Sequence, residues 1–371
     1  MIVSKNRSLP EKFTAADPFI EVVMEDGFAQ ARPLVIDGQT PYASAFTENR
    51  YWDRVDHSFA TRSDFQNQEG DDIFAIADYP LFVTTLSAER LNAAGLSDLS
   101  LTANTKVTLR EDVRLSLDPS GFRIDENVEF RQGVPLAYTD AAPAVFSMQA
   151  RAIEHAGVIR IPSGRVEMNI TDTVTSPFVQ FPSDDRKIEN LVLPHRIFLA
   201  AASRVDVAGD RLYNNLAGSI DPLQFGHVEG GEILLKDDSR GLAQGAVVLT
   251  SSASLDVSGG FEFGPTDGFM AGDAGQLQIS ANTVALEGTL AGYSVLGRKG
   301  GGITLQADNL KVLQPQEVPG LPADFAFGSE IPPAIQGGLQ LADDRLDATG
   351  FTRIALISGS SLDVQTGTHL H

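Results

Sequence analysis

The sequence predicts an all-β fold, a β-solenoid of stacked coils interrupted by loop insertions. Three observations predict it: short segments in which apolar and polar residues alternate, a fixed step between paired segments, and an internal duplication. The chain has 371 residues, of which 42% are hydrophobic and 21% charged, and this composition excludes a disordered chain. Helical periodicity is weak throughout, and the best helical candidate, Thr85 to Ala94, is short and ends at Gly95.

Short alternating segments recur from about residue 83 onward, separated by glycine or asparagine turns. Alternation is typical of a half-buried strand, because successive side chains of a strand point to opposite faces of the sheet. The clearest apolar pairs are Leu99/Leu101, Ile197/Leu199, Val247/Leu249, Leu277/Ile279, Ile303/Leu305 and Ile354/Leu356. Each segment is therefore expected to have one buried face and one solvent face.

These strands come in pairs at a nearly constant step. The apolar pairs that begin at Ile197, Val247 and Ile354 are followed eight residues later by a second apolar pair. Those that begin at Leu277 and Ile303 are followed after seven. A strand, a small turn and another strand describe one coil of a β-solenoid, which buries its apolar face only by stacking on neighbouring coils.

The second strand of each eight-residue pair reads hydrophobe-Asp-Val. The aspartates concerned are Asp206, Asp256 and Asp363. Because the apolar residues on either side of each aspartate point inward, we expect the three carboxylates to point to solvent. Their expected role is solubility and the protection of strand edges, without a part in chemistry.

A longer repeat is also present. The segment LSAERLNAAGLSDLSL, residues 86–101, matches LADDRLDATGFTRIAL, residues 341–356, at an offset of 255 (341 − 86). The shared pattern is L-x-x-x-R-L-x-A-x-G, and the apolar and glycine positions stay in register. We interpret the two segments as copies of one duplicated motif.

The solenoid pattern divides the chain into two parts. Residues 1–82 form an irregular, β-rich N-terminal segment, and residues 83–371 form the repeat region. Insertions are expected at about 208–230 and 313–338, where proline, aromatic and polar residues occur without alternation. Their aromatic residues either contact a receptor or glycan or tuck the insertion onto the solenoid. The residues concerned are Phe225, Phe325 and Phe327.

Composition excludes several classes of partner. The formal net charge is −21, and such an acidic surface repels phosphate backbones and anionic lipid, so nucleic acid is not an expected partner. With no cysteine, the chain has neither disulfides nor thiolate metal sites. No apolar stretch is long enough to insert into a membrane. The N-terminus lacks the apolar core of a signal peptide, so an exported chain of this sequence is expected to be an internal piece of something longer.

A search for chemistry finds no catalytic, cofactor or metal motif. GYSVLG, residues 292–297, has Leu296 where the hydrolase elbow needs glycine, and GRKGGGIT lacks the spacing of a phosphate-binding loop. The six histidines show no compact metal spacing. His369 and His371 form a weak ligand pair, which we interpret instead as part of an exposed terminus. The prediction is a protein that is not an enzyme and has no cofactor.

Three weaker patterns each have a structural interpretation as well as a functional one. Asp184-Asp185-Arg186-Lys187 and Asp343-Asp344-Arg345 combine carboxylates with basic residues, as a carbohydrate-active enzyme requires, but rows of opposite charges are usually solvated loops. Asn169-Ile170-Thr171 fits the glycosylation sequon inside a strand-like stretch, where we interpret it as chance.

Several stretches together resemble a known family. They are LDVSGG (residues 255–260), the glycine-rich segment 272–307, LPHRIFLAAASRVDVAG (residues 193–209) and the duplicated motif. Over residues 85–364 the chain resembles the repeats of filamentous-haemagglutinin-like large exoproteins. The resemblance implies a right-handed parallel β-helix, exported by two-partner secretion through an outer-membrane transporter to the extracellular space or bacterial cell surface. It also implies adhesion, aggregation or biofilm formation, with a cell receptor or glycan as partner and self-association into filaments.

The predicted function is therefore a structural and adhesive segment of a surface exoprotein that gives reach and presents loops. Two alternatives stay open: a β-helix polysaccharide lyase or hydrolase, and the stalk of a contact-dependent toxin. A cleft with convergent carboxylates and a basic residue would favour the enzyme. Neither a secretion domain nor a toxin module is recognisable in the sequence. Exposed coil ends carry unpaired backbone groups, so we expect a cap or further coils there.

Overall fold

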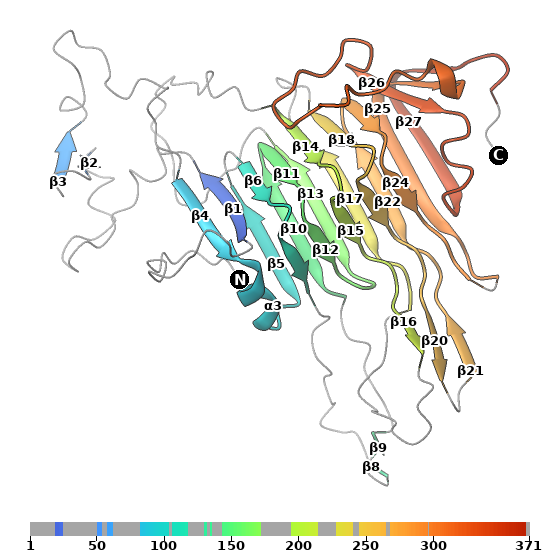
Figure 1. The fold of residues 1–371 in the computed structure, drawn as a ribbon, viewed down its shortest axis with the longest axis horizontal. Helices are drawn as coiled ribbons and strands as arrows, with labels where there is room; N and C mark the ends of the chain where they lie inside the picture. Colours follow the sequence, from blue (N-terminus) through green and yellow to red (C-terminus); the bar gives the residue numbers. More distant parts are fainter. Residues whose placement is uncertain are drawn as a thin grey trace.

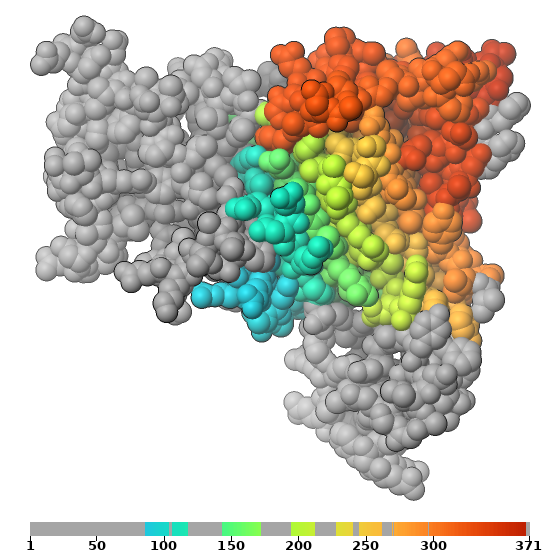
Figure 2. Space-filling view, viewed as in Figure 1, coloured from blue at the N-terminus to red at the C-terminus, as the bar shows by residue number. Residues whose placement is uncertain are grey.

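The computed structural model of the chain describes residues 82–103, 106–117, 143–171, 194–213, 228–239, 245–264, 268–295 and 297–368, together with the backbone of five short strands elsewhere. Most strands run parallel and build a large, nearly closed sheet, so the fold is all-β and solenoid-like (Figure 1). In the space-filling view, successive parts of the sequence form adjacent bands of colour (Figure 2), as stacked coils require.

The strands form three parallel stacks, which we call the first, second and third ladders. Each of the first five coils contributes one strand to each ladder, and the C-terminal coils contribute none to the third. The first ladder contains β5 (Asp98–Thr102), β10 (Val145–Ala150), β13 (Arg165–Ile170), β17 (Glu232–Asp237), β22 (Gln276–Ser280) and the first halves of β25 (Gly301–Leu313) and β27 (Phe351–Val364). The second contains β6 (Lys106–Leu109), β11 (Ala152–His155), β14 (Arg196–Leu199), β18 (Ala246–Leu249), β23 (Thr283–Leu286), β26 (Gly338–Ala342) and the second halves of β25 and β27. The third contains β7 (Arg114–Ser116), β12 (Val158–Arg160), β15 (Arg204–Asp206), β19 (Ser254–Asp256) and β24 (Thr289–Ala291).

Alternation along the strands builds one continuous core. In the first ladder, side chains in register fill the same inward position in successive coils, and they are Leu99, Phe146, Val166, Ile233, Leu277 and Ile303. All of them are buried in a single apolar cluster that runs the length of the stack. The prediction of half-buried strands is confirmed for β5 and β13, whose burial alternates. It was wrong for β14 and β18, which are buried on both faces, and for β27, where Ile354 is exposed.

The shortest coil takes 20 residues, because Val145 pairs with Arg165 (165 − 145). Other coils reach the same register after long excursions, as when Arg165 pairs with Glu232. Excursions therefore leave the coil without changing how its strands stack. Between coils, β16 (Arg211–Tyr213), β20 (Phe261–Gly264) and β21 (Gly268–Ala271) form a small side sheet. Two hairpins lie outside the ladders and are formed by β2 (Arg50–Asp53) with β3 (Ser58–Thr61) and by β8 (Phe130–Arg131) with β9 (Val134–Pro135).

The eight-residue step between paired apolar segments connects different pairs of ladders in different parts of the structure. The eight-residue step from Ile197 to Val205 runs from the second ladder to the third. The eight-residue step from Ile354 to Leu362 runs from the first ladder to the second, within β27. A register shift explains the length, because Ala307 pairs with Ser358 while Asn309 pairs with Ser361, so β27 holds one extra residue. The three hydrophobe-Asp-Val strands are therefore not equivalent.

Antiparallel strands and a helix lie over the second and third ladders at the N-terminal end of the stack, whereas β5 pairs only with β10 among the described strands. β1 (Phe19–Met24) pairs antiparallel with both β6 and β4 (Phe82–Ser87). Helix α3 (Ala88–Ala93) follows β4, within the span predicted to be helical, and the Ser87 hydroxyl caps it by accepting from the Arg90 amide. Leu91 packs against the core as a half-buried residue.

The C-terminal coils depart from simple stacking. The second ladder runs β23–β26–β25–β27, so β26 lies between β23 and β25 although it follows β25 in the chain. Residues 314–337, with the short η3 (Pro315–Glu317), make the excursion that returns the chain to this slot. β27 pairs only with β25 among the described strands. No helix in the described residues is long and apolar enough to cross a membrane.

The excursion at 314–337 packs on the outside of the second ladder. Its aromatic and aliphatic residues cover Phe198 and Val248, whose side chains point away from the main core. The Phe198 ring lies 6.1 Å from the Phe325 ring and 6.2 Å from the Phe327 ring between centroids. Of the two readings of these aromatics, the structure supports packing on the solenoid for Phe325 and Phe327, whereas Phe225 lies outside the described residues.

Candidate functional site

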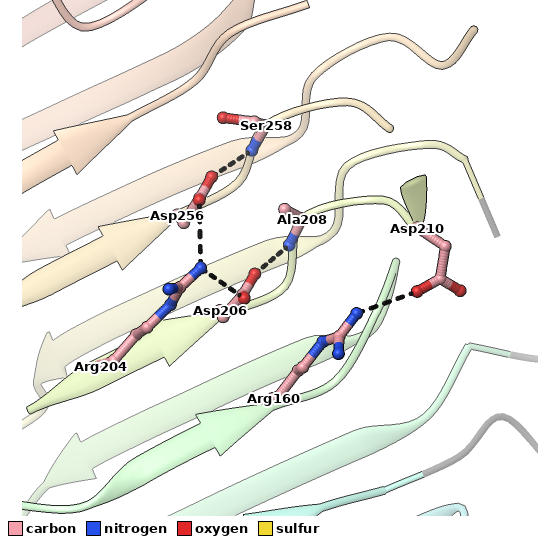
Figure 3. Close-up of polar contacts among 7 residues, drawn as sticks. All are labelled: Arg160, Arg204, Asp206, Ala208, Asp210, Asp256 and Ser258. Atoms are coloured by element: carbon pink, nitrogen blue, oxygen red, sulfur yellow. Dashed lines mark hydrogen bonds and ion pairs between the residues drawn. The ribbon is translucent and has the colours of Figure 1, made fainter. Parts of the chain in front are cut away.

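The outer surface of the third ladder carries the candidate site. Leu115, Ile159 and Val205 point into the core and are at most 1% exposed, so their neighbours in the strands point outward. These outward positions hold arginine and aspartate residues, which stand out on an otherwise acidic chain. We call the surface formed by Arg114, Arg160, Arg204, Asp206, Asp210, Arg211 and Asp256 the Arg–Asp face. Figure 3 shows these residues except Arg114 and Arg211.

Ion pairs tie successive coils together across this face. The Arg204 Nη2 lies 2.7 Å from Asp206 Oδ2 in its own strand and 3.7 Å from Asp256 Oδ2 in the next coil. The Arg160 Nη2 lies 3.3 Å from Asp210 Oδ1, which belongs to the following coil (Figure 3). The arginine side chains are about half exposed, so each pair contributes little to folding free energy but orients its partners.

The two aspartates also hold the turns that end their strands. The Asp206 Oδ1 accepts a hydrogen bond from the Ala208 amide at 3.1 Å, and the Asp256 Oδ1 accepts one from the Ser258 amide at 3.0 Å. Asp206 is consequently only 8% exposed, so the expectation that it points freely to solvent was wrong. Its side chain folds back on the backbone because a short carboxylate satisfies an amide two residues on. Asp363 is exposed and makes no such turn.

A groove of about 610 Å³ runs over the Arg–Asp face. Arg114 and Arg204 both stand opposite Val158, so they occupy the same outward position two strands apart, about 10 Å at the strand spacing of a sheet. The guanidinium groups of Arg114 and Arg211 make no hydrogen bond or ion pair with any residue that the structure describes. Both side chains are exposed at the groove.

This arrangement favours anion binding over acid–base chemistry. A guanidinium offers a planar fork of donors that fits a carboxylate, sulfate or phosphate. The carboxylates are less available, since one oxygen of Asp206 accepts from Arg204 and the other from the Ala208 amide. Among the described residues, no three histidine or acidic side chains lie close enough together to hold a metal ion.

The Asp343-Asp344-Arg345 candidate lies elsewhere, in the turn after β26. The Arg345 guanidinium donates to the Gly288 carbonyl, and this contact ties the last turn to the coil below. Burial lowers the pKa of Arg345, and the nearby carboxylates of Asp344 and Glu287 oppose that shift. A small cavity of about 270 Å³ adjoins it. This cluster does not meet the Arg–Asp face.

Other predicted candidates have structural partners or lie outside the described residues. The Asn169 amide donates to Asp238 at 2.6 Å within the first ladder, which is a structural role for the sequon residue. Residues 184–187, His369 and His371 lie outside the described residues.

His155 is the one deeply buried histidine among the described residues. It stands in register with Leu109 and Leu199, so it fills a position in the core column that leucine fills in adjacent coils. Its Nε2 lies 3.2 Å from the Arg204 carbonyl, whereas its Nδ1 has no hydrogen-bond partner. Burial lowers its pKa to about 4, and the backbone hydrogen bond opposes the shift. The ring is therefore neutral at physiological pH.

Sequence reasoning missed the arginines of the face. Arg204 directly precedes a hydrophobe-Asp-Val strand, which is a local signal for its place beside Asp206. Arg114 and Arg160 carry no such signal, because the alignment of Arg114 with Arg204 and of Arg160 with Asp206 depends on coil register across insertions of unequal length. In comparisons with known proteins, no protein-family model, no curated protein and no solved structure matches the chain.

Proposed function

We propose that the chain is a structural and adhesive segment of a secreted bacterial exoprotein, built as a right-handed parallel β-helix that presents loops at a distance from the cell. The observation that carries the proposal is the single apolar column through all coils. A stack whose neighbours share one core behaves as a stiff rod whose length grows with the number of coils.

The tolerance of the coils to excursions supports a presenting role. The register from β13 to β17 is as regular as that from β10 to β13, although the first spans a long insertion and the second spans none. Loops of many sizes can therefore be carried without disturbing the rod. Export through an outer-membrane two-partner transporter suits a chain with no cysteines, since it threads the membrane unfolded and needs no disulfide to fold outside.

The Arg–Asp face is the described surface best suited to contact a ligand. Free guanidinium groups at Arg114 and Arg211 would meet the carboxylates or sulfates of an anionic glycan, which a net charge of −21 elsewhere would repel. Contact of this kind is local and salt-sensitive.

Retention of protein-coated beads on cells and on immobilised acidic polysaccharides tests this role. Beads that carry the full chain should be retained, and R114A/R211A should weaken retention about tenfold, the effect of roughly 1.4 kcal/mol. K299A/K311A removes the same charge from two exposed lysines elsewhere and should change little. Retention no better than that of uncoated beads on every surface would contradict the adhesive role.

A carbohydrate-active enzyme is the second candidate function, because carboxylates and arginines converge in the groove. Against it stand the engaged oxygens of Asp206, which leave Asp256 as the one groove carboxylate whose Oδ2 accepts no hydrogen bond from a described residue. Incubating the chain with the same polysaccharides and measuring their size distribution decides between the two. Unchanged chain lengths are expected; depolymerisation that D256N abolishes would replace the adhesive proposal with the enzymatic one.

A further inference from the structure

The C-terminal end of the stack presents an open layer of core. Ile354 and Leu362 stand in register with Ile303 and Leu310, which are at most 1% exposed, yet Ile354 is 38% and Leu362 55% exposed. Val364 is likewise 54% exposed. β27 has no partner on its outer edge among the described strands, so alternate backbone amides and carbonyls are also unpaired there. A further strand layer would satisfy both the apolar side chains and the edge.

The inward positions of β27 are symmetric about Gly359. Leu356 and Leu362 lie three residues to either side of Gly359, and Ile354 and Val364 lie five to either side. In an antiparallel pair of identical strands centred on Gly359, Ile354 would stand opposite Val364 of the second copy and Leu356 opposite Leu362. Residues that stand opposite each other share a face of the sheet, so all four would stay on the core side.

We propose that two copies of the chain stack end to end through this layer, with β27 pairing antiparallel to its counterpart about a two-fold axis at Gly359. β27 runs along the first ladder and then the second, bending near Gly359. An axis that lies in the plane of the coil and bisects this bend exchanges the two halves of the strand and reverses its direction. It also keeps the inside of one stack facing the inside of the other, as a continuous core requires.

The charges of β27 agree with this register. Arg353 and Asp363 are its only charged residues, and both are exposed. With Gly359 at the centre, Arg353 stands opposite Gln365 of the second copy, so Asp363 of that copy is its diagonal neighbour. Diagonal neighbours across antiparallel strands are about 7–8 Å apart, within reach of a long arginine side chain. The symmetry forms this attractive contact twice and brings no like charges together.

The other end of the stack cannot repeat this contact. Antiparallel β1 covers the outer edge of β6, and the apolar residues Leu99 and Leu101 of β5 are only 7% and 6% exposed, so the described N-terminal end does not offer a matching apolar layer. A two-fold contact uses the same patch on both copies and therefore closes. The expected assembly is a dimer of stacks, in place of the open filament that the sequence suggested.

Sedimentation of the full 371-residue chain tests the dimer. The chain should sediment as a dimer that dissociates on dilution, and L362D should shift it to monomer while leaving its circular dichroism unchanged, because residue 362 is exposed in the monomer. D347N, an exposed site on the same end outside β27, should leave the dimer intact. A monomer at every concentration, or an open-ended series of larger species, would overturn the proposal.

Single cysteines test the register, because the chain contains none of its own. At the two-fold axis Gly359 meets itself at about 5 Å between Cα atoms, which allows a disulfide. Under mild oxidation G359C should give a covalent dimer, whereas A355C, which stands opposite Asp363 of the second copy, should not. Equal cross-linking of both, or of neither in a chain that sediments as a dimer, would exclude this pairing.

Discussion

The two ends of the stack are built from the two copies of one duplicated motif, yet one end is covered and the other is open. Both copies follow the same path. Each leaves a strand in line with the second ladder (β4 or β26), crosses beside the third ladder in a short segment, and enters a strand of the first ladder (β5 or β27). The equivalent glycines Gly95 and Gly350 both adopt positive φ, 60° and 81°. The equivalent residues Leu99 and Ile354 both point inward, but Leu99 is 7% exposed and Ile354 38%.

Local sequence explains why the intermediate segments differ. The first copy forms helix α3, capped by Ser87, whereas the second has Ala342 at the equivalent position and forms successive turns. The second segment lies against β24, where Leu346 is only 3% exposed, while the equivalent Leu91 is half-buried. One motif therefore gives a helix where its cap is present and turns where the cap is missing and neighbours hold the chain.

Low pH should destabilise the N-terminal coils more than the C-terminal coils, because the buried His155 lies in the second coil. Its folded pKa of about 4 is below the usual 6.5, so unfolded chains take up the proton first as pH falls. Stability is complete above about pH 6.5 and declines toward pH 4 by about 3 kcal/mol. Chemical denaturation between pH 7.5 and 4.5 should show this loss in the wild type and much less of it in H155L.

Hydrogen exchange at the same pH values locates the loss. Strands β10 and β11 should open faster at low pH than β22 and β23, since His155 is the buried histidine of the described core. Parallel pH dependence of stability in wild type and H155L would show that other groups govern acid unfolding.

Truncation of equivalent core residues should separate the ends directly. L99A removes a buried side chain and should cost about 3 kcal/mol of unfolding free energy. I354A removes a side chain that is already 38% exposed and should cost about 1 kcal/mol in dilute, monomeric protein. Urea denaturation of both variants measures the difference. Equal losses would mean that the C-terminal layer is as covered as the N-terminal one.

The paired glycines give the smallest contrast. Alanine at either position should lower the free energy of unfolding by about 1 kcal/mol, because the backbone there is left-handed. At Gly350 a Cβ would also lie 2.7 Å from the Tyr293 Cα, whereas at Gly95 nothing lies within 4 Å. G350A should therefore be less stable than G95A by a further 1–2 kcal/mol or so in thermal unfolding. Identical melting temperatures would contradict the close contact of the second copy with the coil below.

Much of the fold was readable from local pattern. Alternation predicted the inward residues, such as Leu277 and Ile303, because side-chain direction in a strand depends on position alone. The duplicated motif was also readable, and its two copies lead into the strands β5 and β27. The position of β26 between β23 and β25 could not be predicted from the sequence, because strand order depends on where the chain returns after residues 314–337.

The site was less predictable than the fold. The Arg–Asp face is assembled from coils whose separation in sequence varies with each insertion, so no spacing rule links Arg114 to Arg204. The burial of Asp206 depends on its hydrogen bond to the Ala208 amide, which alternation does not report. His155 is visible in the sequence only once its register with Leu109 and Leu199 is known.

Engineered disulfides test most directly the claim that both ends belong to one parallel stack. Ser100 and Ala355 are equivalent residues of the duplicated motif, and they stand opposite Ser147 and Thr304 in the adjacent coils. S100C/S147C and T304C/A355C should both form intramolecular disulfides, because directly opposite residues are about 5 Å apart. S100C/Q149C and Q306C/A355C, each displaced by two residues, should stay reduced. Bonding in the displaced pairs but not in the matched ones would contradict the stack.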